Sequence, residues 1–398
     1  MERAYSGRRG CARNGSTANR DMLKADMSQA TARHLLHIFA SFGYGGVPIR
    51  ICEVINGLPD GFRHTIVALD ACCDAGKRLA PHTTVEFRNL TLPRYDIFRS
   101  MVQVRGLVRE ASPDLLLTYN WGAIECALAN RLFGVCDHIH FESGFGSEEG
   151  SGQLWRRNLF RRFALARVQK LVVPSRTLMD IAQGSWGIPP SRLLHIPNGV
   201  DVLRFSGEPG KREDLVLADA SRHDTIIGTA APLRPEKNIG RLLRAFAALP
   251  AQLDCGLVIA GGGAEMTSLR ELAAELGISE RTYFLGHIDD VPAMLRGIDV
   301  FALSSDTEQM PNSLLQAMSA GRPVAAVDVG DVGGIVAPEN QPLVVPRDDR
   351  GAFVAALATL VGDAARREKL GRLNQQRIRA RYSLDGMVAA YGALLGAT

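Results

Sequence analysis

The chain has 398 residues, of which 46% are hydrophobic and 22% are charged, and its formal net charge is +4. This length suffices for two hydrophobic cores, whereas so small a net charge argues against a nucleic-acid partner. The seven cysteines lack Cys-x-x-Cys spacing and no run of about 18 apolar residues occurs, which argues against a disulfide framework and against a membrane-spanning helix.

The first 30 residues form a polar segment that is rich in Arg, Ser and Asn. Arg8-Arg9 precedes no hydrophobic stretch, so a twin-arginine export signal is not favoured. We interpret residues 1–30 as a disordered tail, or as residues upstream of a later start such as Met22 or Met27. Because the cysteine usage is typical of a reducing compartment, we expect a cytoplasmic protein.

From residue 34, short apolar runs alternate with amphipathic stretches of helical length. Strands are predicted at residues 34–40, 64–70, 83–87, 114–119, 137–142, 170–174 and 192–197. Helices are predicted from about residue 48 and over about 96–110, 121–133 and 153–168. This alternation is typical of a parallel sheet covered on both faces, and it defines a first domain over residues 34–202.

The alternation lapses at residues 203–222, which we interpret as the connection between two domains. Strands are predicted again at residues 225–233, 255–262, 282–287, 299–305 and 323–330, and the last third of the chain is helical. The second domain therefore spans residues 223–380. The predicted fold class is α/β, with two doubly wound Rossmann-like domains whose strand ends face a shared cleft, where ligands are expected.

Two glycine-rich joints lie between a predicted strand and the helix that follows it. Gly45 and Gly46 follow the first strand, where glycines let backbone amides approach a phosphate at the start of a helix. Their spacing departs from Gly-x-Gly-x-x-Gly, so a dehydrogenase is disfavoured, and such a joint often only turns the chain. Gly262 and Gly263 form a similar joint in the second domain.

A pair of cations follows the first strand of the second domain. Arg234 and Lys237 flank a Pro-Glu pair where a helix begins. Two cations at the mouth of a parallel sheet suit a diphosphate, and the alternative is the solvated start of a helix. Because this pair and the joint at Gly262 belong to one domain, we predict a phosphate site there.

The segment at residues 304–324 adds a polar turn in front of a helix. The amides of Asn312, Ser313 and Leu314, at the start of that helix, are predicted donors for an anion. Glu308 lies ahead of them, where its carboxylate can accept hydrogen bonds from sugar hydroxyls. The segment therefore predicts contacts with both an anion and a sugar.

In chain order, the segments GGVPIR, NGVD, LRPEKN, GGG, GHIDDVPAML, IDVFALSS and TEQMPNSLLQAM resemble the family 4 glycosyltransferases from about residue 34 to the end. The resemblance implies the GT-B fold, and transfer of a hexosyl unit from a nucleoside-diphosphate sugar to a saccharide or lipid-linked acceptor with retention of configuration. It implies synthesis of a bacterial surface polysaccharide, exopolysaccharide or glycolipid. It also implies that residues 381–398 form a helix that crosses back to the first domain. No metal or other cofactor is expected, since the sequence has no Asp-x-Asp and no His/Cys cluster with ligand spacing.

Two positions depart from the family pattern. Glu308 matches a glutamate that faces the donor sugar, whereas Gln316 occupies the place of a second glutamate that holds the ribose. An amide there lowers donor affinity by ~1 kcal/mol, or five- to tenfold. Ser143 occupies the place of a histidine, so the role of that histidine would fall to the adjacent Glu142, a candidate catalytic group, to a backbone group or to another side chain. The cationic pair and the helix amides would stabilise the leaving diphosphate.

The predicted helix near residues 153–168 is basic and amphipathic. Its cations are Arg156, Arg157, Arg161, Arg162, Arg167 and Lys170. Such a helix suits an anionic membrane surface on the cytoplasmic side, which would place the enzyme near a lipid-linked acceptor. The alternative is a helix packed on its own sheet with a solvated basic face.

Two other functions stay open. A sugar-nucleotide epimerase on the same fold would need its own acid/base pair, which the sequence does not reveal. A non-catalytic subunit that binds a sugar nucleotide would suit the departures at Gln316 and Ser143.

Overall fold

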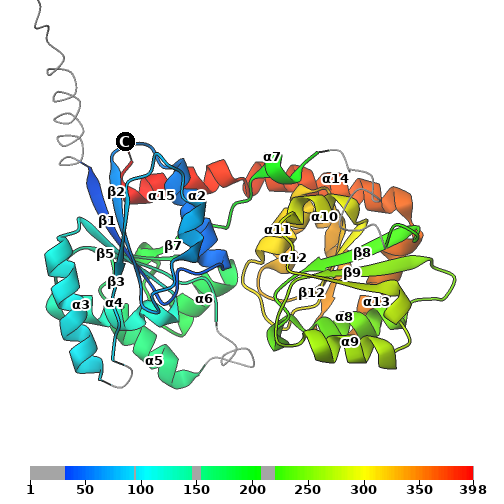
Figure 1. Cartoon of the computed structure of the whole chain (residues 1–398), viewed down its shortest axis with the longest axis horizontal. Coiled ribbons are helices and arrows are strands. Elements are labelled where there is room, and N and C mark those ends of the chain that lie inside the picture. Colours follow the sequence, from blue (N-terminus) through cyan, green and yellow to red (C-terminus); the bar gives the residue numbers. More distant parts are fainter. Residues whose placement is uncertain (1–31, 94–95, 146–153, 208–219, 398) are drawn as a thin grey trace, which may run out of the picture.

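The computed structural model describes residues 32–93, 96–145, 154–207 and 220–397, which form two lobes side by side (Figure 1). The predicted tail at residues 1–30 lies outside the described residues. Each lobe contains one sheet in which every strand pairing is parallel. The predicted α/β class with two doubly wound domains is therefore confirmed.

The first sheet has the strand order β3-β2-β1-β4-β5-β6-β7. Its strands are β1 (Arg33–Phe39), β2 (Phe62–Ala68), β3 (Val85–Asn89), β4 (Leu115–Tyr119), β5 (His138–Phe141), β6 (Lys170–Val173) and β7 (Leu193–His195). The helices of this lobe are α2 (Gly46–Gly57), α3 (Ile97–Ala111), α4 (Ile124–Phe133), α5 (Trp155–Ala164) and α6 (Arg176–Gly184). One face of the sheet packs against α2, and the other face packs against α3, α4, α5 and α6.

The second sheet has the strand order β10-β9-β8-β11-β12-β13. Its strands are β8 (Thr225–Ala230), β9 (Cys255–Ala260), β10 (Thr282–Gly286), β11 (Val300–Leu303), β12 (Val324–Asp328) and β13 (Val344–Pro346). Its helices are α7 (Val202–Phe205), η7 (Pro235–Lys237), α8 (Ile239–Ala247), α9 (Met266–Glu275), α10 (Val291–Gly297), α11 (Asn312–Ser319), α12 (Val332–Ile335) and α13 (Arg350–Gly362). The sequence analysis interpreted the end of the chain as helical and did not predict β13.

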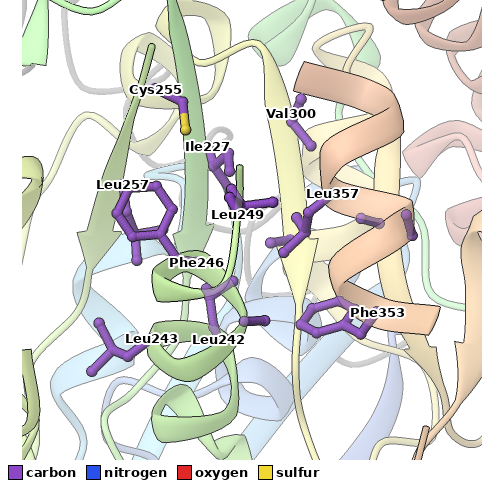
Figure 2. Packing of buried hydrophobic residues seen from close by; sticks show 14 of the residues in the cluster. Ile227, Leu242, Leu243, Phe246, Leu249, Cys255, Leu257, Val300, Phe353 and Leu357 are labelled. Carbon is purple, nitrogen blue, oxygen red and sulfur yellow. The ribbon is translucent and has the colours of Figure 1, made fainter. Parts of the chain in front are cut away.

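The core of the second domain forms because its sheet is covered on both faces. All six residues of β9 are buried, as expected of a strand without a solvent-facing side. Figure 2 shows side chains from β8, β9, β11, α8, the segment after α8 and α13 packed together, namely Ile227, Leu242, Leu243, Phe246, Leu249, Cys255, Leu257, Val300, Phe353 and Leu357. Each fully buried Leu or Phe contributes about 1.5–3 kcal/mol, so this cluster fixes the sheet that positions the site.

The C-terminal helices α14 (Ala364–Arg381) and α15 (Leu384–Leu395) run along both lobes (Figure 1). Met387, Tyr391 and Leu395 recur at four-residue spacing on α15 and belong to the hydrophobic core of the first domain. A parallel bridge between Val200 and Ser383 holds the chain where it crosses. The end of the chain therefore packs on α2 of the first domain. Within the described ranges, none of the helices is both long and apolar enough to cross a bilayer.

Candidate active site

The site lies where the strand order of the second sheet reverses. In that sheet β8 has β9 on one side and β11 on the other, so the loops after β8 and β11 diverge. The crevice between such loops is where doubly wound sheets bind ligands. Lys237 is in the loop after β8 and Glu308 is in the loop after β11.

Lys237 and Glu308 are in direct contact. The Nζ atom of Lys237 lies 2.5 Å from Oε1 of Glu308, and the Ser305 hydroxyl donates to the same oxygen at 2.8 Å. The side chains of Lys237 and Glu308 are 21% and 11% exposed, so the ion pair is largely shielded from water yet accessible. Shielding from water strengthens the attraction between the ammonium of Lys237 and the carboxylate of Glu308.

Neighbouring polar groups hold these two loops together. The Arg241 guanidinium donates to the Ser304 carbonyl and to the Asp306 carboxylate, both at 2.6 Å. Asn238 donates to the other oxygen of Asp306 at 3.0 Å, and its own side chain caps α8. Asn238 adopts a left-handed conformation with φ of 41°, which asparagine tolerates better than most residues. These contacts hold residues 304–306, the part of the loop that precedes Glu308, against the loop after β8.

Arg234 does not join the contact between Lys237 and Glu308. Its side chain is 67% exposed and lies 4.0 Å from the Glu236 carboxylate. Its role as a cation for the diphosphate therefore depends on a side chain that is free to move, and we keep that role as a proposal.

The glycine joint after β9 packs against the loop after β8. Leu233, next to Arg234, donates its amide to the Gly262 carbonyl at 2.9 Å. A Cβ atom on Gly263 would lie 2.2 Å from the Leu233 carbonyl oxygen, so only glycine permits this approach. The structure therefore gives Gly263 a packing role, whereas Gly262 has open space around it. Phosphate binding by these two glycines stays a prediction.

Of the three backbone amides predicted as anion donors at the start of α11, one is already hydrogen-bonded. The Leu314 amide donates to the Pro311 carbonyl at 3.2 Å and its side chain is buried, which corrects the prediction of a free donor there. Within the described residues, no side chain caps α11, whose N-cap is Pro311. The amides of Asn312 and Ser313 therefore stay candidate donors for an anion.

A cavity of about 390 Å³ lies between the two domains. Asn312 and Gln316 of α11 line it from the second domain, and Tyr44 and Arg50 line it from the first. Gly46 faces the same place, since a Cβ atom on it would lie 3.4 Å from Nδ2 of Asn312. Lys237 and Glu308 are not among the lining residues, so the predicted ribose contact and the predicted sugar contact flank different parts of the cleft. A larger hollow of about 690 Å³, between α2 and α15, contains none of the predicted site residues.

Arg50 is a site residue that the sequence analysis missed. It is 6% exposed and donates to the Ser143 hydroxyl at 2.7 Å and to the Asn198 side chain. Asn198 in turn donates to Asn312 at 2.9 Å. A chain of hydrogen bonds therefore runs from the end of β5 to the start of α11, across both domains. The available signal was the arginine of GGVPIR, one turn into the helix after the glycine joint.

Glu142 does not reach the cleft, which corrects its assignment as a catalytic group. Its side chain is fully buried and its Oε2 atom lies 3.5 Å from Nε of Arg161, which is also fully buried. The aromatic rings of Trp121, Trp186 and Phe145 surround the Arg161 guanidinium at 4.8, 5.0 and 5.3 Å from their centroids. Glu142, predicted to be catalytic, and Arg161, predicted to belong to the basic face of a helix, therefore form a structural ion pair inside the first domain.

The histidines of β5 are also structural. His138 and His140 are buried, and each ring lies 2.7 Å from the Thr118 hydroxyl. Burial lowers the pKa of His138 to about 3, because a charged imidazole would lose its water. In the cavity between the domains, burial likewise raises the pKa of Glu53, although nearby Arg204 opposes this shift.

No metal-binding cluster is found within the described part of the chain, where no three His, Cys, Asp or Glu side chains are placed to share an ion. A reaction without a metal stays a prediction.

Two facing Rossmann-like domains with a site at the switch point are the GT-B fold. A crystal structure of Anabaena Alr3699/HepE in complex with UDP and glucose aligns with 92% of this chain and 100% of that one, with a TM-score of 0.77 and 17% identity. Residues 44–204 match the family model "Glycosyltransferase Family 4", and residues 218–377 match "Glycosyl transferases group 1". The chain belongs to the family 4 glycosyltransferases.

Two curated relatives illustrate the range of that family. D-inositol 3-phosphate glycosyltransferase of Salinispora tropica is 32% identical over 232 residues, which cover 54% of this chain and 48% of that one. The match therefore spans about half the length of that relative. UDP-Gal:alpha-D-GlcNAc-diphosphoundecaprenol alpha-1,3-galactosyltransferase of Escherichia coli is 26% identical over 290 residues, which cover 69% of this chain and 73% of that one.

Proposed function

We propose that this chain is a retaining, metal-independent glycosyltransferase that moves a sugar from a nucleoside-diphosphate sugar to a saccharide or lipid-linked acceptor. The observation that carries the proposal is the contact of Lys237 with Glu308 at the switch point of the second sheet. UDP and glucose occur in the Anabaena structure, and an undecaprenol-linked saccharide is named in the Escherichia coli relative. Both support a role in surface polysaccharide or glycolipid synthesis.

The proposed roles follow from charge. When the bond between sugar and diphosphate breaks, negative charge grows on the diphosphate, and Lys237 is a preorganised cation for it. Binding of the diphosphate draws the ammonium from Glu308, whose carboxylate is then free to accept hydrogen bonds from the donor sugar. Arg234 approaches from the exposed rim, and the Asn312 and Ser313 amides complete the set of donors. Retention of configuration follows if the acceptor attacks the face from which the diphosphate leaves.

The direct test is a panel of nucleoside diphosphates and their sugars, scored by thermal shift and by nucleotide release, with and without EDTA. A ligand at about 100 times its Kd stabilises by about 2.7 kcal/mol, which is a clear rise in Tm. We expect one base to respond, with the same turnover in EDTA. Interconversion of sugar nucleotides without an acceptor would instead support an epimerase, and binding without turnover on any acceptor would support a non-catalytic subunit.

Replacing Gln316 by glutamate is expected to lower the KM for the donor about five- to tenfold. A carboxylate accepts hydrogen bonds from ribose hydroxyls more strongly than an amide does, by ~1 kcal/mol. Steady-state kinetics with the responding donor measures the change. The matched control is Gln376→Glu, which adds the same charge on the exposed side of α14 and should leave KM as it is. An unchanged KM in both variants would remove Gln316 from the ribose site.

We further propose that an anionic bilayer docks on the surface formed by α3, α4 and α5, which we name the three-helix surface. On α5, Trp155, Leu159 and Phe163 recur at four-residue spacing and are 70%, 60% and 48% exposed. On α3 and α4, Phe98 and Leu132 are 70% and 52% exposed. Adjacent helices of the three pack on each other, so these apolar groups belong to one side of the first domain.

The charge of the three-helix surface matches an anionic partner. The three helices carry eight arginines and two glutamates. Although Arg161 is buried, the remaining arginines give the surface a positive excess. Exposed aromatic groups among arginines fit the boundary between lipid headgroups and acyl chains.

Vesicle sedimentation tests this docking. Wild type is expected to bind phosphatidylglycerol vesicles and not phosphatidylcholine vesicles, and Trp155→Glu with Phe163→Glu should weaken binding at least about tenfold, since each added charge opposes the lipid charge. Leu203→Glu is the matched control, because Leu203 is 86% exposed on α7, outside the three-helix surface. Equal loss in the control variant, or a concentration-dependent dimer that the double variant abolishes, would overturn the membrane assignment.

A further inference from the structure

Two loops of the second domain contact the N-terminus of α6 in the first domain. The Asp331 carboxylate accepts from the Arg176 amide at 2.6 Å, from the Thr177 amide at 3.0 Å and from the Thr177 hydroxyl at 2.8 Å. The Ser175 hydroxyl donates to Oε1 of Gln309 at 3.0 Å. In Figure 1, α6 lies on the side of its lobe that faces α11 and α12.

The helix α6 is therefore capped twice. Its own Ser175 accepts from the Leu178 amide at 3.1 Å, as an ordinary N-cap does. The first two amides of the helix donate to a carboxylate from the other domain, whose charge favours the positive end of a helix. These contacts exist only while the two domains are together, because their partners are in different domains.

The same loops support the segment that carries Glu308. The Asp331 amide donates to the Gln309 carbonyl at 3.2 Å. A Cβ atom on Gly330, whose φ is +56°, would lie 2.1 Å from the Glu308 carbonyl oxygen. From the first domain, Gly144 approaches so closely that a Cβ atom on it would lie 3.3 Å from Cγ of Gln309. Residues 308–309 are thus held between the turn at residues 330–331 and the strand ends of the other domain.

We propose that Asp331 and Gln309 are positioning residues of an interdomain clamp, which consists of Ser175, Thr177, Gln309 and Asp331. The clamp couples closure of the two domains to placement of Glu308 against the donor sugar. The inference rests on the proposed function. Neither side chain touches the reacting atoms. When the domains separate, residues 308–309 lose their contacts with the first domain, while Lys237 keeps its place in the second.

This arrangement separates binding from turnover. The proposed diphosphate contacts of Lys237 and α11 are in the second domain and do not need the clamp. Placement of Glu308 needs it. Loss of the clamp should therefore lower kcat more than it weakens binding of a nucleoside diphosphate.

The test uses Asp331→Ala, Thr177→Val and the double variant in the full chain. We expect Asp331→Ala to lower kcat about 10- to 100-fold, as the loss of a charged hydrogen-bond acceptor would. The double variant should be no slower than Asp331→Ala, because the Thr177 hydroxyl then has lost its partner already. Binding of the responding nucleoside diphosphate should change less than about threefold.

A matched control exists within the second domain. Asp349 caps α13 by accepting from the Ala352 amide at 2.8 Å, without crossing to the first domain. Asp349→Ala should lower the Tm but leave kcat unchanged. If kcat falls equally in the Asp331 and Asp349 variants, or if the Asp331 and Thr177 effects add, the clamp is overturned.

Small-angle X-ray scattering tests the clamp without turnover. Asp331→Ala should have a larger radius of gyration than wild type, and Asp349→Ala should not. An unchanged radius for Asp331→Ala overturns the clamp even if the chain is an active transferase. If the wild-type protein binds no nucleoside diphosphate, the proposed function is overturned instead. The scattering result alone then tests whether the clamp holds the two domains together.

Discussion

Lys237→Ala is expected to lower kcat/KM for the donor by about 100- to 1000-fold. Loss of one preorganised donor to a developing negative charge has an effect of about this size. In this chain the effect is enhanced because Lys237 has a second role. Its ammonium neutralises Glu308, whose side chain is only 11% exposed, so the variant leaves a shielded carboxylate next to the place of the diphosphate.

The rate of nucleotide release from the donor measures this loss of kcat/KM. Two further variants separate the contributions of charge and shape. Lys237→Arg keeps the charge but not the shape, so it should recover part of the activity. Lys369→Ala removes a lysine from the exposed side of α14 and is the control for net charge. If Lys237→Ala keeps donor affinity and turnover, the switch point is not the donor site, and the cavity lined by Gln316 becomes the better candidate.

The fold was predictable because parallel sheets leave a clear local pattern. Strands covered on both faces are continuous apolar runs, and those before β13 were identified from such runs. By contrast, β13 is identified as a strand by its pairing with β12, which the local sequence does not reveal. The crossing of α15 to the first domain came from the resemblance alone, since the contacts of Met387 and Tyr391 with that core are not visible in local spacing.

The site was predictable only in part. Lys237 and Glu308 each follow a strand in the middle of the sheet, so the topology itself brings them to one crevice. Arg50 reaches Asn198 across 148 positions of the chain, and Asp331 reaches Thr177 across 154. The first contact depends on how distant segments of the first domain fold together, and the second depends on how the two domains sit against each other. Strand and helix patterns contain neither.

The error at Glu142 has a specific cause. The residue directly follows β5, where the chain passes from the sheet toward the cleft, and sequence alone does not tell which side its side chain takes. The decisive partner is Arg161, on a helix whose arginines look alike in sequence. Arg161 points inward among three aromatic side chains, and the Glu142 carboxylate is buried beside it.

Glu142→Ala is accordingly expected to lower the free energy of unfolding of the first domain by about 3–5 kcal/mol, because the buried Arg161 guanidinium loses the opposite charge of Glu142. Urea denaturation of the full chain measures it. Replacing both partners, with Glu142→Gln and Arg161→Met, should recover much of the loss, since neither buried charge then remains.

An exposed ion pair provides the control for this stability effect. Glu110 lies 3.2 Å from Arg88 with its side chain 74% exposed, and Glu110→Ala should cost less than about 1 kcal/mol. Folded Glu142→Ala, assayed well below its Tm, should keep wild-type affinity for the responding nucleotide and wild-type kcat. A variant that unfolds like wild type but has lost turnover would return Glu142 to the catalytic set.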